Sequence, residues 1–444
     1  MTTAAAPSKV KRVFGVPVAV ALFFVAMMLP TAVSVNLGGL RLSAYRVVLI
    51  VMFLPMLIQL LSGRAGRIHI FDMLVFAHCA WALLALINWG GVAQGIESGG
   101  IYIVEFAGAY LLARVYIRGY ADFAAMARLY VGLVLGTLLF TIPEALTGVH
   151  ILHDTISGAL GGPMAPFIEP RMGLERTFGP FDHPILYGVF SAAAFSLAYF
   201  VLAEARLMNG RGMAKVVGVG LATFMSASGG PYVVLMMQCF VAAWQRVLGK
   251  IQGRWAALFT LFALMYIAID LFSTKTPFHV FVNNFTFSRQ SAYNRILIFE
   301  YGTAEVARHP IFGIGLGDWE RPSWMSDSMD NFWLVTAVRY GLPAFFLLVA
   351  LLLGLIWAAG QRKGLPADWR RARHAWAFTL FGITVAAATV HLWNALFVLF
   401  LFLIGAGAWL LDAKPGPARP AVPGAARRPR PTIAARPLQP ARLF

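Results

Sequence analysis

The chain has 444 residues, of which 59% are hydrophobic and only 12% charged, and its mean hydropathy is +0.72. A soluble domain cannot bury that much apolar surface, so the composition excludes an ordinary soluble fold. The formal net charge of +17 would suit a nucleic-acid-binding protein. However, the basic residues recur in every second connection between apolar runs, which is the pattern that orients membrane proteins. We therefore expect no nucleic-acid partner.

Apolar runs of about 20 residues, each long enough to cross roughly 30 Å of hydrocarbon, predict an all-α, polytopic transmembrane helical bundle. The runs do not alternate polar with apolar residues, which argues against a transmembrane β-barrel. In chain order, about twelve spans are expected near residues 14–35, 42–61, 71–88, 100–115, 123–145, 184–203, 215–226, 229–248, 255–273, 342–359, 374–391 and 393–411.

The positive-inside rule places both chain ends in the cytoplasm. Residues 1–413 then form the membrane domain, and the Pro- and Arg-rich residues 414–444 form a disordered cytoplasmic tail. This tail either stays solvated or contacts anionic membrane lipids. Cys79 and Cys239 fall inside expected spans, so neither a disulfide nor a thiolate metal site is indicated.

Three ionisable residues, Arg46, Glu105 and Glu144, lie in or near apolar runs of the first half. An ionisable group there is costly unless it is paired or faces a polar cavity. The pattern is compatible with a substrate groove, and equally with ion pairing or with snorkelling to an interface.

Two long connections, residues 146–183 and 274–341, fall on the outer side of this topology. Their Gly- and Pro-rich composition predicts irregular structure, and together they are expected to form a small periplasmic cap. They contain ten acidic and eight basic residues, so they carry no general positive field. Any phosphate site would require particular arginines to be brought together.

The first candidate motif runs from Arg176 to Pro184, RTFGPFDHP, and ends where the sixth span begins. The planar fork of donors on Arg176 suits a phosphate. Asp182 and His183 stand at the start of the next helix, with Pro184 in its first turn. Alternatively, Asp182 caps that helix and Arg176 pairs with Glu175 or Asp182.

The second motif extends from Arg289 to Gly317. Apolar residues recur there at helical spacing, which predicts an amphipathic helix with Arg289 and Arg295 near its start. Pro310 disfavours continuation of the helix and leaves His309 at its end. His309 is a candidate general base that would accept a proton from a sugar hydroxyl, or simply a capping residue. The glycines that follow would permit close approach by a bulky substrate.

The third motif contains Asp330, Asn331 and Trp333, followed by Arg339. The first two offer acceptors for sugar hydroxyls or a partner for His309, and Trp333 offers a ring on which a sugar can stack. The alternative is a helix cap with an interfacial tryptophan. A small-residue turn, residues 226–230, either contributes to the site or only allows tight packing.

No nucleotide-binding signature and no His/Cys ligand set at metal spacing occurs in the sequence. We therefore expect neither a cofactor nor a metal. Energy and sugars would have to arrive in a substrate that is already activated.

The order of these motifs resembles the O-antigen ligase and polysaccharide polymerase superfamily. The resemblance covers residues 105–355 and rests on the Arg176 motif, the small-residue turn, Arg295, the His309-Pro segment with its glycines, and Asn331 with the Tyr340-Gly-Leu segment. Two positions depart from the family pattern: the turn often written Ser-Arg-Gly reads Ser228-Gly-Gly here, and Asp330 stands where a histidine is frequent.

The resemblance implies a glycosyltransferase of the bacterial inner membrane that works at the periplasmic face, without metal, on undecaprenyl-diphosphate-linked glycans. It implies that Arg176 and Arg295 engage the diphosphate and that His309 is essential; His309, or Asp330 with it, would be the catalytic base. The acceptor is either a growing glycan, which we favour slightly, or lipid A-core. Polysaccharide-export machinery is a further expected partner. A lipid-linked oligosaccharide flippase is the competing function, although the chain shows no internal repeat.

Overall fold

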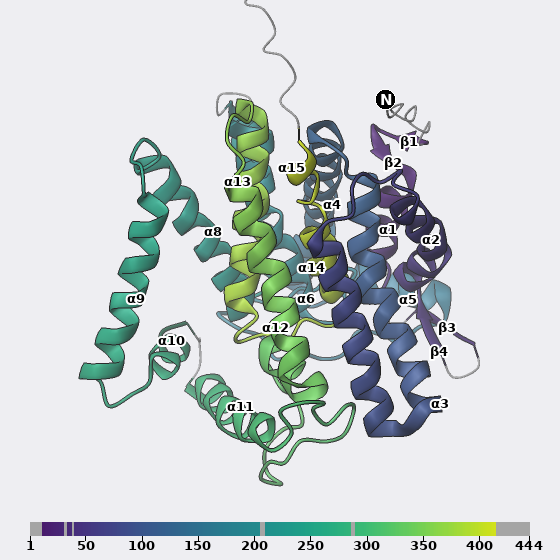
Figure 1. The fold of residues 1–444 in the computed structure, drawn as a ribbon, viewed down its shortest axis with the longest axis vertical. Coiled ribbons are helices and arrows are strands. Elements are labelled where there is room, and N and C mark those ends of the chain that lie inside the picture. The colour runs from purple at the N-terminus through teal and green to yellow at the C-terminus, as the bar shows by residue number, and fades with distance from the viewer. Residues whose placement is uncertain (1–10, 31–32, 38–39, 205–208, 286–288, 414–444) are drawn as a thin grey trace, which may run out of the picture. The chain divides into compact units, whose positions relative to one another are not determined.

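The computed structural model describes residues 11–413, apart from 31–32, 38–39, 205–208 and 286–288. Its regular elements are mostly helices, as expected from the apolar runs (Figure 1). The predicted cytoplasmic tail, residues 414–444, lies outside the described residues. The helices are α1 (Val18–Met27), α2 (Ala44–Leu61), α3 (Ile70–Tyr116), α4 (Tyr120–Thr147), α5 (Ile151–Leu160), α6 (Pro184–Ala193), the π-helix η1 (Leu197–Ala203), α7 (Gly210–Met225), α8 (Gly229–Val247), α9 (Arg254–Phe272), α10 (Pro277–Phe285), α11 (Arg289–Arg308), α12 (Phe332–Gly360), α13 (Ala367–Ala386), α14 (Ala395–Gly405) and α15 (Trp409–Asp412).

Two short antiparallel hairpins accompany the helices near the N-terminus. Strand β1 (Arg12–Val13) pairs with β2 (Val16–Pro17), and β3 (Ser34–Leu37) pairs with β4 (Leu40–Ser43). The first expected span, residues 14–35, is therefore shorter than predicted, because among its described residues only the ten of α1 are α-helical.

Seven segments of the described chain are helical, long enough and apolar enough to cross a membrane. They are Ala44–Leu61, Ile70–Tyr116, Tyr120–Thr147, Pro184–Ala203, Arg254–Phe272, Phe332–Gly360 and Ala395–Asp412. This composition indicates a membrane-embedded helical protein. The remaining expected spans fall on helices that are too short or too polar for that criterion, such as α7, α8 and α13.

Helix α3 contains two of the expected spans, because it is a helical hairpin. Gly91 breaks it with a positive φ of 75° and an extended ψ of 174°. The two arms then pack closely, since a Cβ on Gly99 would lie 2.5 Å from Leu83 Cδ1. Small residues at such a contact allow two helices to approach each other. The reversal is visible at the lower end of α3 in Figure 1.

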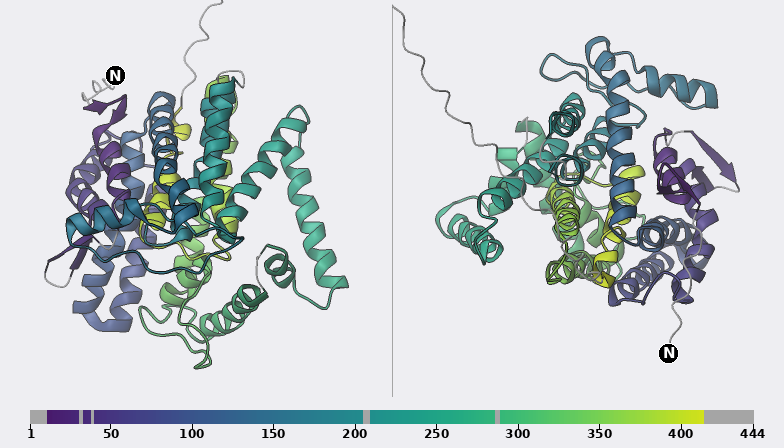
Figure 2. Two further views of the ribbon diagram at one scale, coloured as in Figure 1. Left: turned by 180° about the vertical axis from the view of Figure 1, so that it is seen from behind. Right: turned by 90° about the horizontal axis from the view of Figure 1, so that it is seen from above.

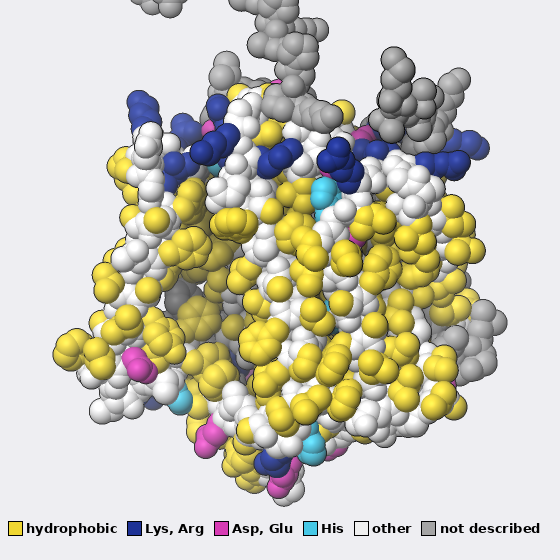
Figure 3. Space-filling view, in the orientation of Figure 1, with side chains coloured by type: hydrophobic (Ala, Val, Ile, Leu, Met, Phe, Trp, Pro, Cys, Tyr) yellow, Lys and Arg dark blue, Asp and Glu magenta, His cyan; other side chains and the backbone are white. Residues whose placement is uncertain are grey.

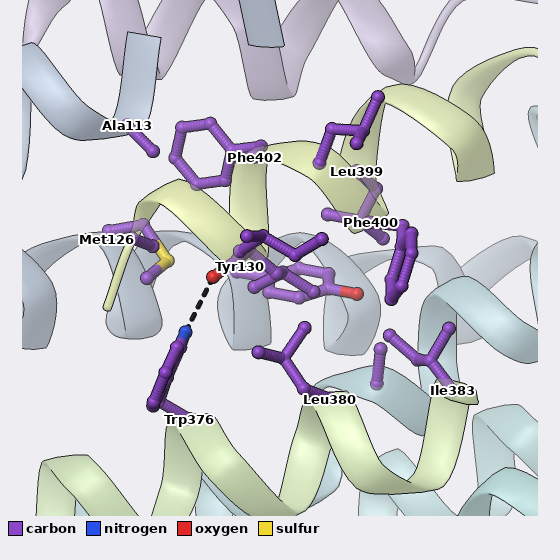
Figure 4. Close-up of a cluster of buried hydrophobic side chains, with 14 of the residues drawn as sticks. Ala113, Met126, Tyr130, Trp376, Leu380, Ile383, Leu399, Phe400 and Phe402 are labelled. Atoms are coloured by element: carbon purple, nitrogen blue, oxygen red, sulfur yellow. Dashed lines mark hydrogen bonds between the residues drawn. The ribbon is translucent and has the colours of Figure 1, made fainter. Parts of the chain in front are cut away.

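The core of the bundle lies where α4, α13 and α14 meet (Figure 4). Tyr130 of α4, Trp376 of α13 and Phe402 of α14 are almost completely buried there. The indole N–H of Trp376 donates to the carbonyl of Leu403 at 2.6 Å, which satisfies the one polar atom of this large side chain. A rigid core of this kind holds the helix ends that carry the polar residues.

Charge is distributed unevenly along the bundle. On the face drawn in Figure 3, Lys and Arg gather at the end that carries the N-terminal end of α13 and the short helix α15. Helix α11 and the loop that follows it lie at the opposite end, away from β1 and β2, in the side views of Figures 1 and 2.

Candidate functional site

A cavity of about 200 Å³ opens where the loop before α6, the α7–α8 turn, the start of α11 and the end of the loop before α12 meet. It brings together four residues singled out in the sequence, which are Arg176, His183, Arg295 and Asp330. Arg171 and Ser228 complete its polar wall. We refer to this as the arginine cavity.

Arg176 is a buried cation in this cavity, with only 7% of its surface exposed. Its Nη2 donates to Ser228 Oγ at 2.8 Å, whereas its Nε is buried with no hydrogen-bond partner among the described residues. Burial, and then the charge of Arg171, lower the pKa of Arg176 to about 10. No described carboxylate lies within ion-pair distance of it, so the alternative that Arg176 pairs with Glu175 or Asp182 is not observed.

The loop that carries Arg176 is held by a carboxylate from inside an expected span. Glu144 of α4 is fully buried, and its Oε1 accepts hydrogen bonds from the backbone N–H of Phe178 at 2.8 Å and from Gly179 at 3.3 Å. His150 Nδ1 lies 2.7 Å from the same oxygen. The costly ionisable residue noted in the sequence thus positions the backbone two residues after Arg176.

The small-residue turn between α7 and α8 has both of the roles considered for it. Ser228 accepts from Arg176 and donates to the carbonyl of Ser226 at 3.0 Å. Gly230 is required by packing, because a Cβ there would lie 2.3 Å from Val390 Cγ2. The turn therefore joins the arginine cavity to the connection between α13 and α14.

Arg295 enters the cavity from the first turns of α11. Its Nε donates to the carbonyl of Thr389 at 3.0 Å, which fixes the guanidinium against the α13–α14 connection. Burial lowers the pKa of Arg295, while the nearby carboxylate of Asp330 opposes that effect. Asp330 itself accepts a hydrogen bond from Ser328 Oγ at 3.0 Å. An arginine and a carboxylate therefore face the same small space.

His183 is a neutral hydrogen-bond donor in the cavity wall. It caps α6, and its Nδ1 accepts from the backbone N–H of Ile185 at 3.1 Å. Nδ1 is therefore unprotonated, and Nε2 carries the hydrogen in the neutral ring. Burial, and then the charges of Arg176 and Arg171, lower the pKa of His183 to about 4. The alternative that Asp182 caps this helix is not observed, because His183 does so; Asp182 Oδ1 lies 3.9 Å from His153 Nε2.

Asn331 and Trp333, which follow Asp330 in the third motif, have structural contacts. Asn331 is the N-cap of α12, where its Oδ1 accepts from the backbone N–H of Leu334 at 3.0 Å. Trp333 donates its indole N–H to the carbonyl of Thr384 at 3.0 Å and thereby packs against α13. Both contacts agree with the capping and packing alternatives considered for these residues.

His309 does not lie with the residues of the arginine cavity. It follows the last residue of α11, fourteen residues after Arg295, and that separation corresponds to about 20 Å along a helix. Its Nε2 lies 3.4 Å from Glu305 Oε1, and half of its side chain is exposed. The expected meeting of His309 with Arg176 and Asp330 is therefore not found. Arg289, in the first turn of α11, is exposed and is not part of the cavity wall.

The glycines after His309 pack closely against the protein itself; a Cβ on Gly315 would lie 2.5 Å from Trp89 Cγ. Their expected role in admitting a bulky substrate stays a prediction. Gly341 breaks α12 with a φ of 78°, and a Cβ on it would lie 1.9 Å from the carbonyl oxygen of Ile311. A Cβ on Gly313 would likewise lie 2.3 Å from the carbonyl oxygen of Val338. The segment therefore locks the end of α11 onto the break in α12.

A second cavity of about 320 Å³ lies beside the first, between α2, α3, α12 and the α13–α14 connection. Arg46 and Glu105 line it and form an ion pair of 2.7 Å, so the pairing alternative considered for them is observed. Arg339 also lines this cavity rather than the arginine cavity. We call it the aromatic cavity, because Tyr102, Tyr340 and Trp393 contribute to its wall.

Sequence reasoning missed two parts of this arrangement. Arg171 shares a loop with Arg176, and that proximity was the available signal. The connection between α13 and α14 had been divided between two spans, so its contacts with Arg295 and His183 could not be anticipated. Neither a scan against models of protein families nor a search of curated protein sequences finds a match to this chain.

Proposed function

We propose that this protein is a membrane glycosyltransferase that transfers or polymerises undecaprenyl-diphosphate-linked oligosaccharides at the periplasmic face of the bacterial inner membrane. The observation that carries the proposal is the convergence of Arg171, Arg176 and Arg295 on one cavity that also contains Asp330. Three guanidinium groups and one carboxylate leave a net of two positive charges. That charge matches a diphosphate diester, which carries two negative charges.

The burial of Arg176 supports an anionic ligand. A buried cation without a carboxylate partner is costly to the fold, and a bound phosphate would compensate that cost. The neutral His183 would add an Nε2–H donor to the same phosphate. Charge-assisted hydrogen bonds from guanidinium groups are among the strongest contacts that proteins make with phosphate.

In the proposed reaction, the acceptor hydroxyl oxygen attacks the anomeric carbon of the donor sugar. Its proton passes to the carboxylate of Asp330, the new C–O bond forms, and the bond from the anomeric carbon to the diphosphate oxygen breaks. The electron pair leaves with the undecaprenyl diphosphate, which gains one negative charge. Arg171, Arg176 and Arg295 would stabilise that developing charge, as fixed donors do at other sites of charge development.

Asp330 is the base that the geometry favours. It lines the arginine cavity, whereas His309 lies about 20 Å from Arg295 along α11. Asp330 is held by Ser328 and stands next to the N-cap of α12, so its position is defined by the helix start. His309 would then act through structure, by joining α11 to α12.

The arrangement of charge supports the proposed orientation. Lys and Arg gather at the end of the bundle opposite α11 on the face shown in Figure 3, as the positive-inside rule requires for a cytoplasmic end. The arginine cavity, with its wall from α11, would then open on the periplasmic side. A substrate there must arrive activated on a lipid carrier.

Reconstitution tests the function directly. The purified protein is placed in liposomes with lipid-linked oligosaccharide extracted from a strain that lacks it, with and without lipid A-core, and product length and attachment are analysed. Longer lipid-linked chains identify a polymerase, which we favour slightly, and chains attached to lipid A-core identify a ligase. Absence of both products, or full product formation by Arg176→Gln, would refute the proposed function.

A further inference from the structure

One segment lines the aromatic cavity and contacts residues of the arginine cavity, and we call it the wall. It consists of residues 389–394, within the connection between α13 and α14. Thr389 accepts from Arg295 on one side, and the ring of Trp393 lies 5.8 Å from the ring of His183. Trp393 lines the aromatic cavity, whereas Arg295 and His183 line the arginine cavity. A ligand in one cavity is therefore held next to a ligand in the other.

The wall contains a strained residue. Asn394 has a φ of 50° and a ψ of −125°, although it has a side chain and lacks the freedom of glycine. Such a conformation is unfavourable for a residue with a side chain and is retained where the surroundings fix it, often at ligand sites. The wall is fixed by the backbone N–H of Phe332, which donates to the carbonyls of Ala387 at 2.9 Å and Val390 at 3.1 Å.

The aromatic cavity contains hydrogen-bonding groups with capacity for a ligand. Glu105 accepts from Arg46 at 2.7 Å and from Tyr45 at 3.1 Å, and both of these bonds are to Oε1. No described residue donates to Oε2, which remains able to accept. Arg339 is exposed in this wall, with no described carboxylate within ion-pair distance. His391 adds a buried Nδ1 without a hydrogen-bond partner among the described residues.

These groups suit a sugar better than a lipid chain. An apolar chain would cover the charged groups of Glu105 and Arg339 without satisfying them, which is unfavourable. A sugar offers hydroxyls for the carboxylate and the guanidinium, and apolar C–H faces for the ring of Trp393. Cavities of this size with a few fixed polar groups among aromatic side chains are typical small-molecule sites.

We propose that the aromatic cavity binds the terminal sugar of the acceptor glycan; this inference rests on the proposed function. Phe332 lines the aromatic cavity and stands two residues after Asp330, which lines the arginine cavity. An acceptor hydroxyl held in the aromatic cavity would therefore enter the reaction beside the proposed base.

The test separates donor binding from acceptor use. Arg339→Gln and Trp393→Ala are purified beside matched controls, Arg308→Gln and Trp324→Ala, which replace exposed residues outside both cavities. Undecaprenyl diphosphate binding in detergent measures the donor site. Initial transfer rates in liposomes, at several concentrations of an acceptor glycan released from the native polymer, measure the acceptor site.

We expect Arg339→Gln and Trp393→Ala to bind undecaprenyl diphosphate within about twofold of wild type, while the acceptor KM rises at least tenfold in either variant. Both controls should match wild type. An unchanged acceptor KM in Arg339→Gln would overturn the inference, and so would a loss of undecaprenyl diphosphate affinity in that variant, because the cavity would then hold the donor. If wild type itself neither binds undecaprenyl diphosphate nor transfers sugar, the proposed function fails instead.

Discussion

Replacement of Arg176 by glutamine should separate binding from stability. The guanidinium is buried without a carboxylate partner, and its pKa of about 10 corresponds to roughly 3 kcal/mol by which the empty site disfavours the charged form. Glutamine removes that cost and sacrifices the hydrogen bond to Ser228, which contributes about 1 kcal/mol. Arg176→Gln should therefore be as stable as wild type, or more stable by about 1–2 kcal/mol.

The same replacement should weaken binding of undecaprenyl diphosphate. Loss of one charge-assisted contact costs about 2 kcal/mol or more, which corresponds to at least a ~30-fold higher Kd. Microscale thermophoresis in detergent gives the Kd, and thermal unfolding followed by tryptophan fluorescence gives the stability. Arg308→Gln is the control, because Arg308 is exposed and pairs with Glu305 and Glu320 away from the cavity.

Two results would contradict this reasoning. An unchanged Kd in Arg176→Gln would show that the cavity does not hold the diphosphate. A clear fall in unfolding temperature would show that Arg176 supports the fold, because a buried cation that awaits an anion should not stabilise the empty protein.

Three further predictions concern the base, the helix break and the capping histidine. Asp330→Asn should lower the transfer rate about 100-fold or more while His309→Ala stays within about threefold of wild type, as timed product analysis would show; the reverse order would restore His309 as the base. Gly341→Ala should destabilise the protein by several kcal/mol, because its Cβ would lie 1.9 Å from a carbonyl oxygen at positive φ, whereas Gly360→Ala, with nothing within 4 Å, should fold normally; equal yields of folded protein would contradict this. The pKa of His183 is about 4 in the folded chain, whereas the unfolded chain binds this proton near pH 6.5. The free energy of unfolding should therefore fall by up to roughly 3 kcal/mol as the pH drops from 6.5 to 4. His183→Asn keeps a capping acceptor and should lose less stability over this range in thermal unfolding; an equal loss would contradict the prediction.

The membrane-spanning helices could be predicted from the sequence because a long apolar run is recognisable from its composition alone. The amphipathic helix expected after Arg289 is present as α11, and its end coincides with the break expected before Pro310. The hairpin in α3 was harder to predict from the sequence, because two spans joined at Gly91 give the same hydropathy pattern as two spans joined by a loop. The first span was overestimated because apolar residues also build β2 and the strand β3.

The sequence by itself singled out the polar residues that line the arginine cavity: Arg176, His183, Arg295 and Asp330 were all identified from their motifs. Only the tertiary structure decided which of them meet. Helix α11 is continuous from Arg289 to Arg308, so Arg295 near its start and His309 just after its end lie too far apart to share a small cavity. The length of α11 separates two residues of the same motif, while Arg176 reaches Ser228 from 52 residues away. Contacts between residues so far apart in the sequence depend on how the helices pack, and local sequence patterns do not predict that packing.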